Sequence, residues 1–231
     1  RKNLHHIAYK KDIYQRIKET ISDFGISKIK RMVLYRYKKY VGYKSIKALP
    51  NQKFYFFPLH FEPETALDLL APYFRDQLML IEHIHQSLPV NHILVIKEHP
   101  NMEGHRKLNY YNNFKNLKNV LLLDKSFSSF EVINDHNCLG VVNISSTAGL
   151  ESIFYGKPCL SFGKTFYNEI KDLCATTTDP TNIYKSLIEM KVWKYNEDNL
   201  IFFLHSIFSM SIKASCDMVS GRRMTMKKSN I

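Results

Sequence analysis

The sequence lacks the long apolar runs, paired cysteines and glycine-rich signatures that identify several common protein classes. No run of about 18 apolar residues occurs, so no transmembrane helix is predicted. The basic, polar start of the chain does not have the pattern of a secretory signal peptide. The four cysteines form no CxxC pair, which favours buried thiols in a reducing compartment. The absence of GxGxxG and GxxxxGK[ST] disfavours a dinucleotide-dependent oxidoreductase and a P-loop NTPase.

Positive charge is concentrated at the start of the chain. The first 48 residues contain 14 Lys and Arg residues against three acidic residues, whereas the remaining residues are nearly balanced. Apolar residues recur there at helical spacing, which predicts a basic helical segment over residues 1–50. Such a segment could bind an anionic membrane surface or nucleic acid. It could equally be a solvated helix pair that links two domains.

From residue 51 onwards, short apolar runs alternate with helical patterns. Strands are predicted at 53–57, 93–96, 120–123, 139–144 and 158–162. Helices are predicted at 64–88, with a kink or restart at Pro72, and at 130–135, 147–155, 181–190 and 197–213. Continuous apolar strands between helices predict a parallel sheet covered on both faces. We therefore predict an α/β fold with a Rossmann-like parallel sheet over 51–215, followed by a flexible basic tail over 216–231.

Polar residues follow several of these strands, and ligands of open parallel sheets bind beyond the carboxyl ends of the strands. After the fourth strand, Ser145, Ser146 and Thr147 lead into a helix. Free N–H groups and the helix dipole favour an anion there, and the hydroxyls add donors. Gly149 would leave room for a phosphate, and Glu151 could accept hydrogen bonds from a ribose. Simple N-capping by Ser146 or Thr147 is the alternative.

Three other strand ends carry candidate ligand-binding residues. Lys97 and His99 alternate at the end of the second strand, so they share a face and could meet a diphosphate or carboxylate. His60 and Glu62 follow the first strand, and Gly163 follows the fifth. A solvated lysine, a histidine that caps a carbonyl and an acid at a helix start would explain the same residues without a ligand. No group of residues has metal-ligand spacing, so we assign no metal and expect no cofactor.

Taken together, the strand ends resemble a known family. The residues that resemble this family occur in the following order: YFFPLHFEPE, YFRDQLMLIEHIHQSLP, ILVIKEHP, NVLLLD, VVNISSTAGLESIFYGKPCLSFG and FYN. These segments, between residues 50 and 170, are similar to the capsular polysaccharide biosynthesis family of bacterial glycosyltransferases, which includes enzymes that transfer Kdo. The resemblance implies a GT-B architecture of two Rossmann-like domains, of which this chain would be the C-terminal, nucleotide-sugar-binding half.

The resemblance also implies roles for the residues at the strand ends. Lys97 and His99 would lie near the phosphate of the donor. The phosphate and nucleotide would be surrounded by Ser145, Ser146, Thr147 and Glu151. The acceptor site and the catalytic base would lie in an N-terminal half, so no catalytic residue is assigned. No such half precedes residue 50 in the sequence given, which leaves the activity of this chain alone open.

The expected reaction is transfer of a sugar from a nucleotide-sugar donor, with CMP-Kdo as a candidate, to a growing capsular or other surface glycan or glycolipid. A sugar-nucleotide enzyme similar to UDP-GlcNAc 2-epimerase is one alternative. A non-catalytic module, whose basic segment binds an anionic membrane or nucleic acid, is the other. A capsule enzyme would be cytoplasmic. For such an enzyme, we expect residues 1–48 to bind the inner face of the plasma membrane and not nucleic acid.

Overall fold

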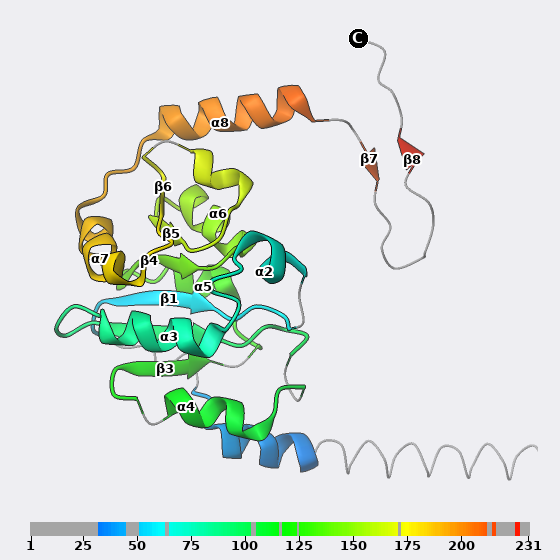
Figure 1. The fold of residues 1–231 in the computed structure, drawn as a ribbon, viewed down its shortest axis with the longest axis vertical. Helices are drawn as coiled ribbons and strands as arrows, with labels where there is room; N and C mark the ends of the chain where they lie inside the picture. The colour runs from blue at the N-terminus through cyan, green and yellow to red at the C-terminus, as the bar shows by residue number, and fades with distance from the viewer. Residues whose placement is uncertain are drawn as a thin grey trace, which may run out of the picture.

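The computed structural model describes residues 32–44, 51–62, 65–102, 105–115, 117–123, 125–170, 172–211, 214–215 and 225–226. Its centre is a six-stranded sheet in the order β3-β2-β1-β4-β5-β6 (Figure 1). All neighbouring strands in this sheet are parallel. The chain adds β2 and β3 on one side of β1 and then continues with β4 on the other. The carboxyl ends of β1 and β4 therefore form the topological switch point, where ligands of such sheets bind.

The strands confirm the predicted Rossmann-like parallel sheet and add one strand to it. They are β1 (Phe54–Pro58), β2 (Ile93–Lys97), β3 (Val120–Leu123), β4 (Cys138–Asn143), β5 (Cys159–Ser161) and β6 (Cys174–Thr176). Each residue of β1 is buried, as expected for a central strand covered on both faces. The edge strand β6 was not predicted, because its three residues are partly exposed and form no apolar run.

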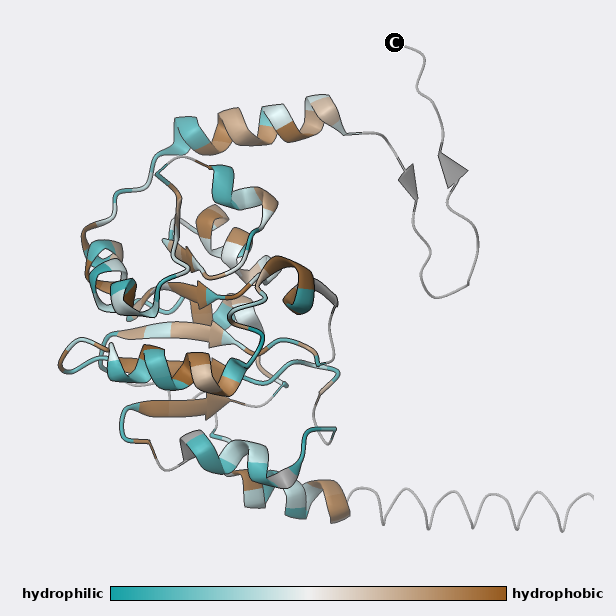
Figure 2. Cartoon of the chain, in the orientation of Figure 1, coloured by the Kyte–Doolittle hydropathy of each residue, from teal (hydrophilic) through white to brown (hydrophobic). Residues whose placement is uncertain are grey.

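Helices cover both faces of the sheet. They are α2 (Thr65–Leu70), α3 (Gln77–Gln86), α4 (Asn112–Lys115), α5 (Ser129–Ile133), α6 (Thr147–Phe154), α7 (Ile183–Val192) and α8 (Glu197–Met210). Short 3-10 helices lie at η2 (Leu108–Tyr111), η3 (Phe166–Glu169) and η4 (Pro180–Asn182). Tyr55 and Phe57 face the core beneath α3 and α7, whereas Phe54 and Phe56 face the core beneath α5 and α6. Figure 2 shows hydrophobic residues along the strands and hydrophilic residues on much of α3 and α7.

Two helix predictions are refined by the structure. The region predicted as a helix over 64–88 forms two separate helices, α2 and α3, with Pro72 in the interruption between them. Asp76 caps α3, because its carboxylate accepts the N–H groups of Leu78 at 3.0 Å and Met79 at 3.2 Å. The predicted helix after β4 is confirmed as α6, and Gly156 follows its end with a φ of 67°.

The described part of the basic segment packs against the edge of the sheet. Residues 32–41 are helical, as predicted, and Val41 in this helix is 1% exposed. The backbone N–H of Lys44 donates to the carbonyl of Leu122 at 2.8 Å, which extends the pairing beyond β3. The rest of the predicted basic segment lies outside the described residues. So does most of the predicted tail over 216–231; within that tail, β8 (Thr225–Met226) pairs with β7 (Ala214–Ser215), which precedes it.

Two further sequence observations concern cysteines and membrane spans. Cys138 and Cys159 are buried free thiols, as expected, and Cys174 is a partly exposed one, whereas Cys216 lies outside the described residues. Within the described ranges, no helix has both the length and the apolar character needed to cross a membrane.

Candidate ligand-binding site

The structure brings two of the candidate residues together at the switch point. His60 follows β1 and is 5% exposed. Its ring Nε2 accepts the backbone N–H of Ser145, which follows β4, at 3.3 Å. The first and fourth strand ends therefore meet, as the sequence predicted from the position of ligand sites in parallel sheets.

The start of α6 uses most of its own hydrogen-bond donors internally. The N–H of Ser146 donates to Asn143 Oδ1 at 2.8 Å, and Ser146 Oγ accepts the N–H of Ala148 at 3.2 Å. N-capping by Ser146, one of the two explanations given above, is thus confirmed. The N–H of Thr147 has no hydrogen-bond partner among the described residues, and neither has the buried Oγ of Ser145. Together with the exposed hydroxyl of Thr147, these two groups are the unpaired donors around the start of α6 among the described residues.

The structure explains Gly149 and Gly163 by packing. A Cβ atom on Gly149 would lie within 2.8 Å of three side chains, those of Asn143, Tyr167 and Cys159. Its N–H already donates to Ser146 O at 3.1 Å. The expectation that Gly149 leaves room for a phosphate is therefore corrected, because the side on which it lacks a Cβ faces the protein interior.

Gly163 makes an equally close approach to its neighbours. Its N–H donates to Ile144 O at 2.7 Å, and a Cβ at this position would lie 2.7 Å from the same oxygen.

Glu151 lies one turn into α6 and is half-buried. Its contact with a ribose stays a prediction.

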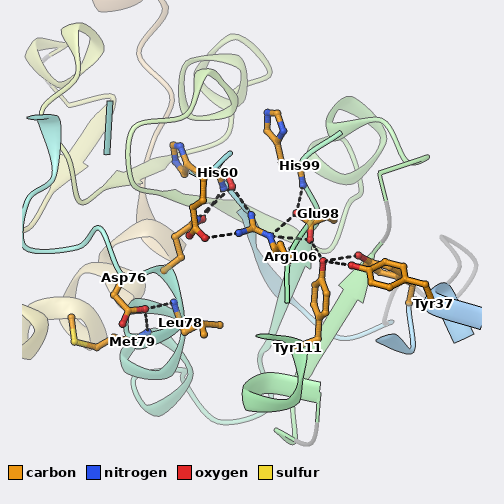
Figure 3. Close-up of polar contacts among 12 residues, drawn as sticks. Tyr37, His60, Asp76, Leu78, Met79, Glu98, His99, Arg106 and Tyr111 are labelled. Carbon is orange, nitrogen blue, oxygen red and sulfur yellow. Dashed lines mark hydrogen bonds and ion pairs between the residues drawn. The ribbon is translucent and has the colours of Figure 1, made fainter. Parts of the chain in front are cut away.

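Lys97 and His99 lie at the end of β2, on either side of a buried acid. Lys97 is the last residue of the strand and is 6% exposed, so the alternative of a solvated lysine does not hold. His99 is half-buried, and its ring makes an edge contact with the ring of Phe61, 5.8 Å between centroids. Figure 3 shows the rings of His60 and His99 on the same side of the polar residues between them.

Those polar residues form a network that sequence reasoning missed, except for Glu62. Arg106 has a side chain that is 1% exposed and binds Glu62 through Nη1 at 2.8 Å. Its Nε donates to both carboxylate oxygens of Glu98, at 3.1 and 3.2 Å. Glu98 also accepts the N–H of His99 at 2.7 Å and the hydroxyl of Tyr111 (Figure 3).

The network extends to α3 and to the basic segment. Gln77 at the start of α3 donates to Glu62 and accepts the N–H of His60 at 2.7 Å. On the opposite side, Tyr111 accepts hydrogen bonds from the hydroxyls of Tyr37 and Tyr43, at 3.0 and 3.1 Å. The network thus links the basic segment, η2 and both strand ends.

Direct contacts within the network stabilise the charge of Arg106. Burial alone would lower the pKa of Arg106, but its interactions with Tyr110, Glu98 and Glu62 raise that pKa overall, so the guanidinium stays charged. Burial, followed by the neighbouring carboxylate of Glu98, raises the pKa of Tyr111. Its hydroxyl therefore keeps its proton and donates to the carboxylate.

The fold and the position of these residues define a Rossmann-like α/β domain with a candidate ligand site at its switch point. This chain belongs to the family described as capsule polysaccharide biosynthesis protein, whose family model matches residues 2–175. The family is the one that the sequence motifs indicated. A search among curated proteins finds no match.

Several solved structures are similar to the chain at low identity. One is the β Kdo 2,7 transferase of Thermosulfurimonas dismutans KpsC, with 18% identity, a TM-score of 0.45, and 77% of this chain and 63% of that chain covered. The β Kdo 2,4 transferase of the same KpsC has 14% identity, a TM-score of 0.44, and 71% and 55% covered. The wall teichoic acid polymerase TagF has 13% identity, a TM-score of 0.41, and 76% and 43% covered. The chain thus spans less than two thirds of the length of each.

Proposed function

We propose that this chain is the donor-binding half of a GT-B-type glycosyltransferase that transfers a sugar to a growing capsular or other surface glycan. Membership of the capsule polysaccharide biosynthesis family carries this proposal. The meeting of His60 and Ser145 at the switch point of a parallel sheet supports it. The proposed donor is a nucleotide-sugar, with CMP-Kdo as the first candidate, and the proposed acceptor is a glycan or glycolipid.

The proposed chemistry requires stabilisation of a departing phosphate. Negative charge develops on the phosphate oxygens as the bond to the sugar breaks, and oriented donors lower the energy of that state. The N–H of Thr147 and the Oγ of Ser145 are the donors at the start of α6, where the helix dipole also favours an anion. Lys97 and His99 would add positive charge or further donors from the end of β2.

A pair of variants at Thr147 tests the phosphate site directly. Thr147 is the first residue of α6, a position at which proline is compatible with a helix. The preceding Ser146 has an extended backbone with φ −79° and ψ 146°, which also tolerates a following proline. Thr147→Pro removes the N–H and the hydroxyl, whereas Thr147→Ala removes the hydroxyl alone. The difference between the two variants therefore isolates the N–H.

The measurement is calorimetric titration and thermal unfolding with CMP, UDP, GDP and CDP. The proposal expects one nucleotide to bind and to raise the melting temperature. Thr147→Pro should weaken the binding of that nucleotide about tenfold more than Thr147→Ala does. This difference is equivalent to about 1.4 kcal/mol, as expected for one charge-assisted hydrogen bond. Unchanged affinity in Thr147→Pro, together with unchanged affinity in Lys97→Ala and His99→Ala, would remove the site assignment.

We further propose a cytoplasmic location in which the basic segment lies on the anionic inner face of the plasma membrane. Residues 32–44 contain four basic residues and no acidic one. The helix over 32–41 exposes Met32, Val33, Tyr35 and Tyr40. Exposed apolar and aromatic side chains among basic ones suit the boundary between lipid headgroups and acyl chains.

Cosedimentation with vesicles tests this location. The protein should bind vesicles that contain phosphatidylglycerol more strongly than phosphatidylcholine vesicles, and added salt should weaken the binding. Arg36→Glu with Lys39→Glu should abolish the preference. The matched control is Lys191→Glu with Lys194→Glu, two exposed residues at the end of α7 and just after it. A salt-dependent shift with RNA, without vesicle binding, would favour nucleic acid instead.

A further inference from the structure

The backbone of His60 is held on both sides by buried side chains. Gln77 Oε1 accepts the N–H of His60 at 2.7 Å. The carbonyl of His60 accepts hydrogen bonds from Arg106 Nη2 and from Gln77 Nε2. Because both of its polar backbone groups are bonded to buried partners, the backbone at His60 cannot rotate without losing a hydrogen bond. The direction in which the His60 side chain leaves the backbone is therefore fixed.

The ring of His60 is held by a contact that specifies where its proton lies. The backbone N–H of Ser145 can only donate, so Nε2 of His60 is the acceptor in their 3.3 Å contact. A neutral His60 consequently carries its proton on Nδ1. Since this distance is near the upper limit for a hydrogen bond, a small displacement of the His60 backbone would break the contact.

Glu98 holds the backbone of the loop after β2 by a hydrogen bond, as Gln77 and Arg106 hold the backbone of His60. One oxygen of Glu98 accepts the N–H of His99 at 2.7 Å, while Arg106 Nε contacts both of its oxygens. The guanidinium of Arg106 is planar, and its donors have a fixed relative geometry. It holds the His60 carbonyl and the Glu98 carboxylate at once (Figure 3). One rigid group therefore sets the spacing between the loops that carry His60 and His99.

We propose that Arg106, Glu98 and Gln77 are positioning residues that hold His60 and His99 in place for nucleotide binding. The inference rests on the proposed donor-binding function of this edge of the sheet. Arg106 is 6% exposed, Glu98 0% and Gln77 1%, so these side chains act through the two histidines and not by contact with the nucleotide. A purely structural network would also stabilise the fold, but it would leave the proton position of His60 and the nucleotide affinity unchanged in a folded variant.

The first experiment measures the proton position of His60 without any ligand. Long-range ¹H–¹⁵N correlation spectra of protein with ¹⁵N-labelled histidine identify the protonated ring nitrogen, and a His60→Gln variant assigns the signal. The wild-type protein should show the Nδ1–H form. Arg106→Lys keeps the charge but cannot reproduce the fork of donors. Gln77→Met removes the partner of the His60 N–H with little change in volume. Either variant should shift His60 towards the Nε2–H form, which is the commoner form in water.

The second experiment measures nucleotide affinity in the same proteins by calorimetric titration with CMP, UDP, GDP and CDP. Each variant should bind the nucleotide preferred by the wild type about tenfold more weakly. The control is Arg75→Lys, an exposed arginine just before α3, which should match the wild type in both experiments. Circular dichroism measures whether each variant is folded. If Arg106→Lys does not fold, the Gln77→Met variant tests the proposal.

The outcomes separate this inference from the proposed function. If the wild type binds none of the four nucleotides, the donor-binding proposal fails, and the spectra alone decide whether the network positions His60. If the wild type binds a nucleotide but the folded variants keep both its affinity and the Nδ1–H signal, the network is structural only and the inference is overturned. Loss of the Nδ1–H signal together with weaker binding supports both proposals.

Discussion

Removal of Arg106 alone should be among the most destabilising single substitutions in this domain. The Arg106→Met variant keeps a similar length and apolar stem but loses every donor. Glu98 is fully buried and would lose its contact with the guanidinium. The carbonyl of His60 would lose its hydrogen bond to the guanidinium, and Glu62, which is 33% exposed, would be less affected because water can reach it.

The expected loss of stability follows from the difference in burial between Glu98 and Glu62. Removing one partner of a buried ion pair costs about 3–5 kcal/mol, because the remaining charge is left desolvated. In a protein of about this size, each kcal/mol lowers the melting temperature by about 2–4 °C. Arg106→Met should therefore melt about 6–20 °C below the wild type. Arg75→Met, at an exposed arginine, should stay within about 0.5 kcal/mol.

Urea unfolding followed by circular dichroism measures both variants. The double variant Arg106→Met with Glu98→Met removes the buried charge as well as its partner. It should be less destabilised than the sum of the two single variants by about 0.5–3 kcal/mol. A loss below about 1 kcal/mol in Arg106→Met, or strict additivity in the double variant, would refute the view that Arg106 compensates the charge of Glu98.

Three further changes test other parts of the fold. Gly149→Ala should lower the free energy of unfolding in urea by about 1–3 kcal/mol, because the added methyl group has no space; stability equal to the wild type would contradict the packing. Tyr167→Phe should lose about 1 kcal/mol in the same assay, since its buried hydroxyl donates to Ser146 O at 2.7 Å. Burial raises the pKa of the Cys138 thiol to about 12, so at pH 8 iodoacetamide should label Cys174 well before Cys138 in peptide mass spectra, and equal labelling would count against that burial.

The sheet could be predicted because its central strands are apolar on both faces. Runs such as Ile93–Lys97 have an unambiguous length and composition, and helices between them require parallel pairing. The edge strand Cys174–Thr176 could not be recognised, because an edge strand needs less burial and carries little apolar signal. The helix start at Asp76 was not predicted for a different reason. Pro72 indicated a kink or a restart, but an aspartate within a helical pattern can be an exposed residue as well as an N-cap, so the sequence does not locate the cap.

The site was only partly predictable for a related reason. Strand ends are local in sequence, so His60, His99 and Ser145 could be proposed from their positions after apolar runs. The partners of Arg106 lie 44 and 8 residues away, and no local pattern specifies such contacts. One signal was nevertheless present. Glu98 follows a buried strand directly, and a carboxylate in that position requires a cationic partner if it is buried. The next arginine along the chain is Arg106, which is the partner that the structure shows.

The hydrogen bonds at the start of α6 change how an anion would have to bind. Had the N–H groups of Ser145, Ser146 and Thr147 all been unpaired, the helix dipole and the backbone could bind a phosphate without help. Instead, Ser145 donates to His60 and Ser146 donates to Asn143. A single backbone N–H is a weak basis for affinity, so neighbouring side chains must supply the remaining donors and charge. Nucleotide binding at this edge should consequently depend on the placement of the loops after β1 and β2, which is what the Arg106 network determines.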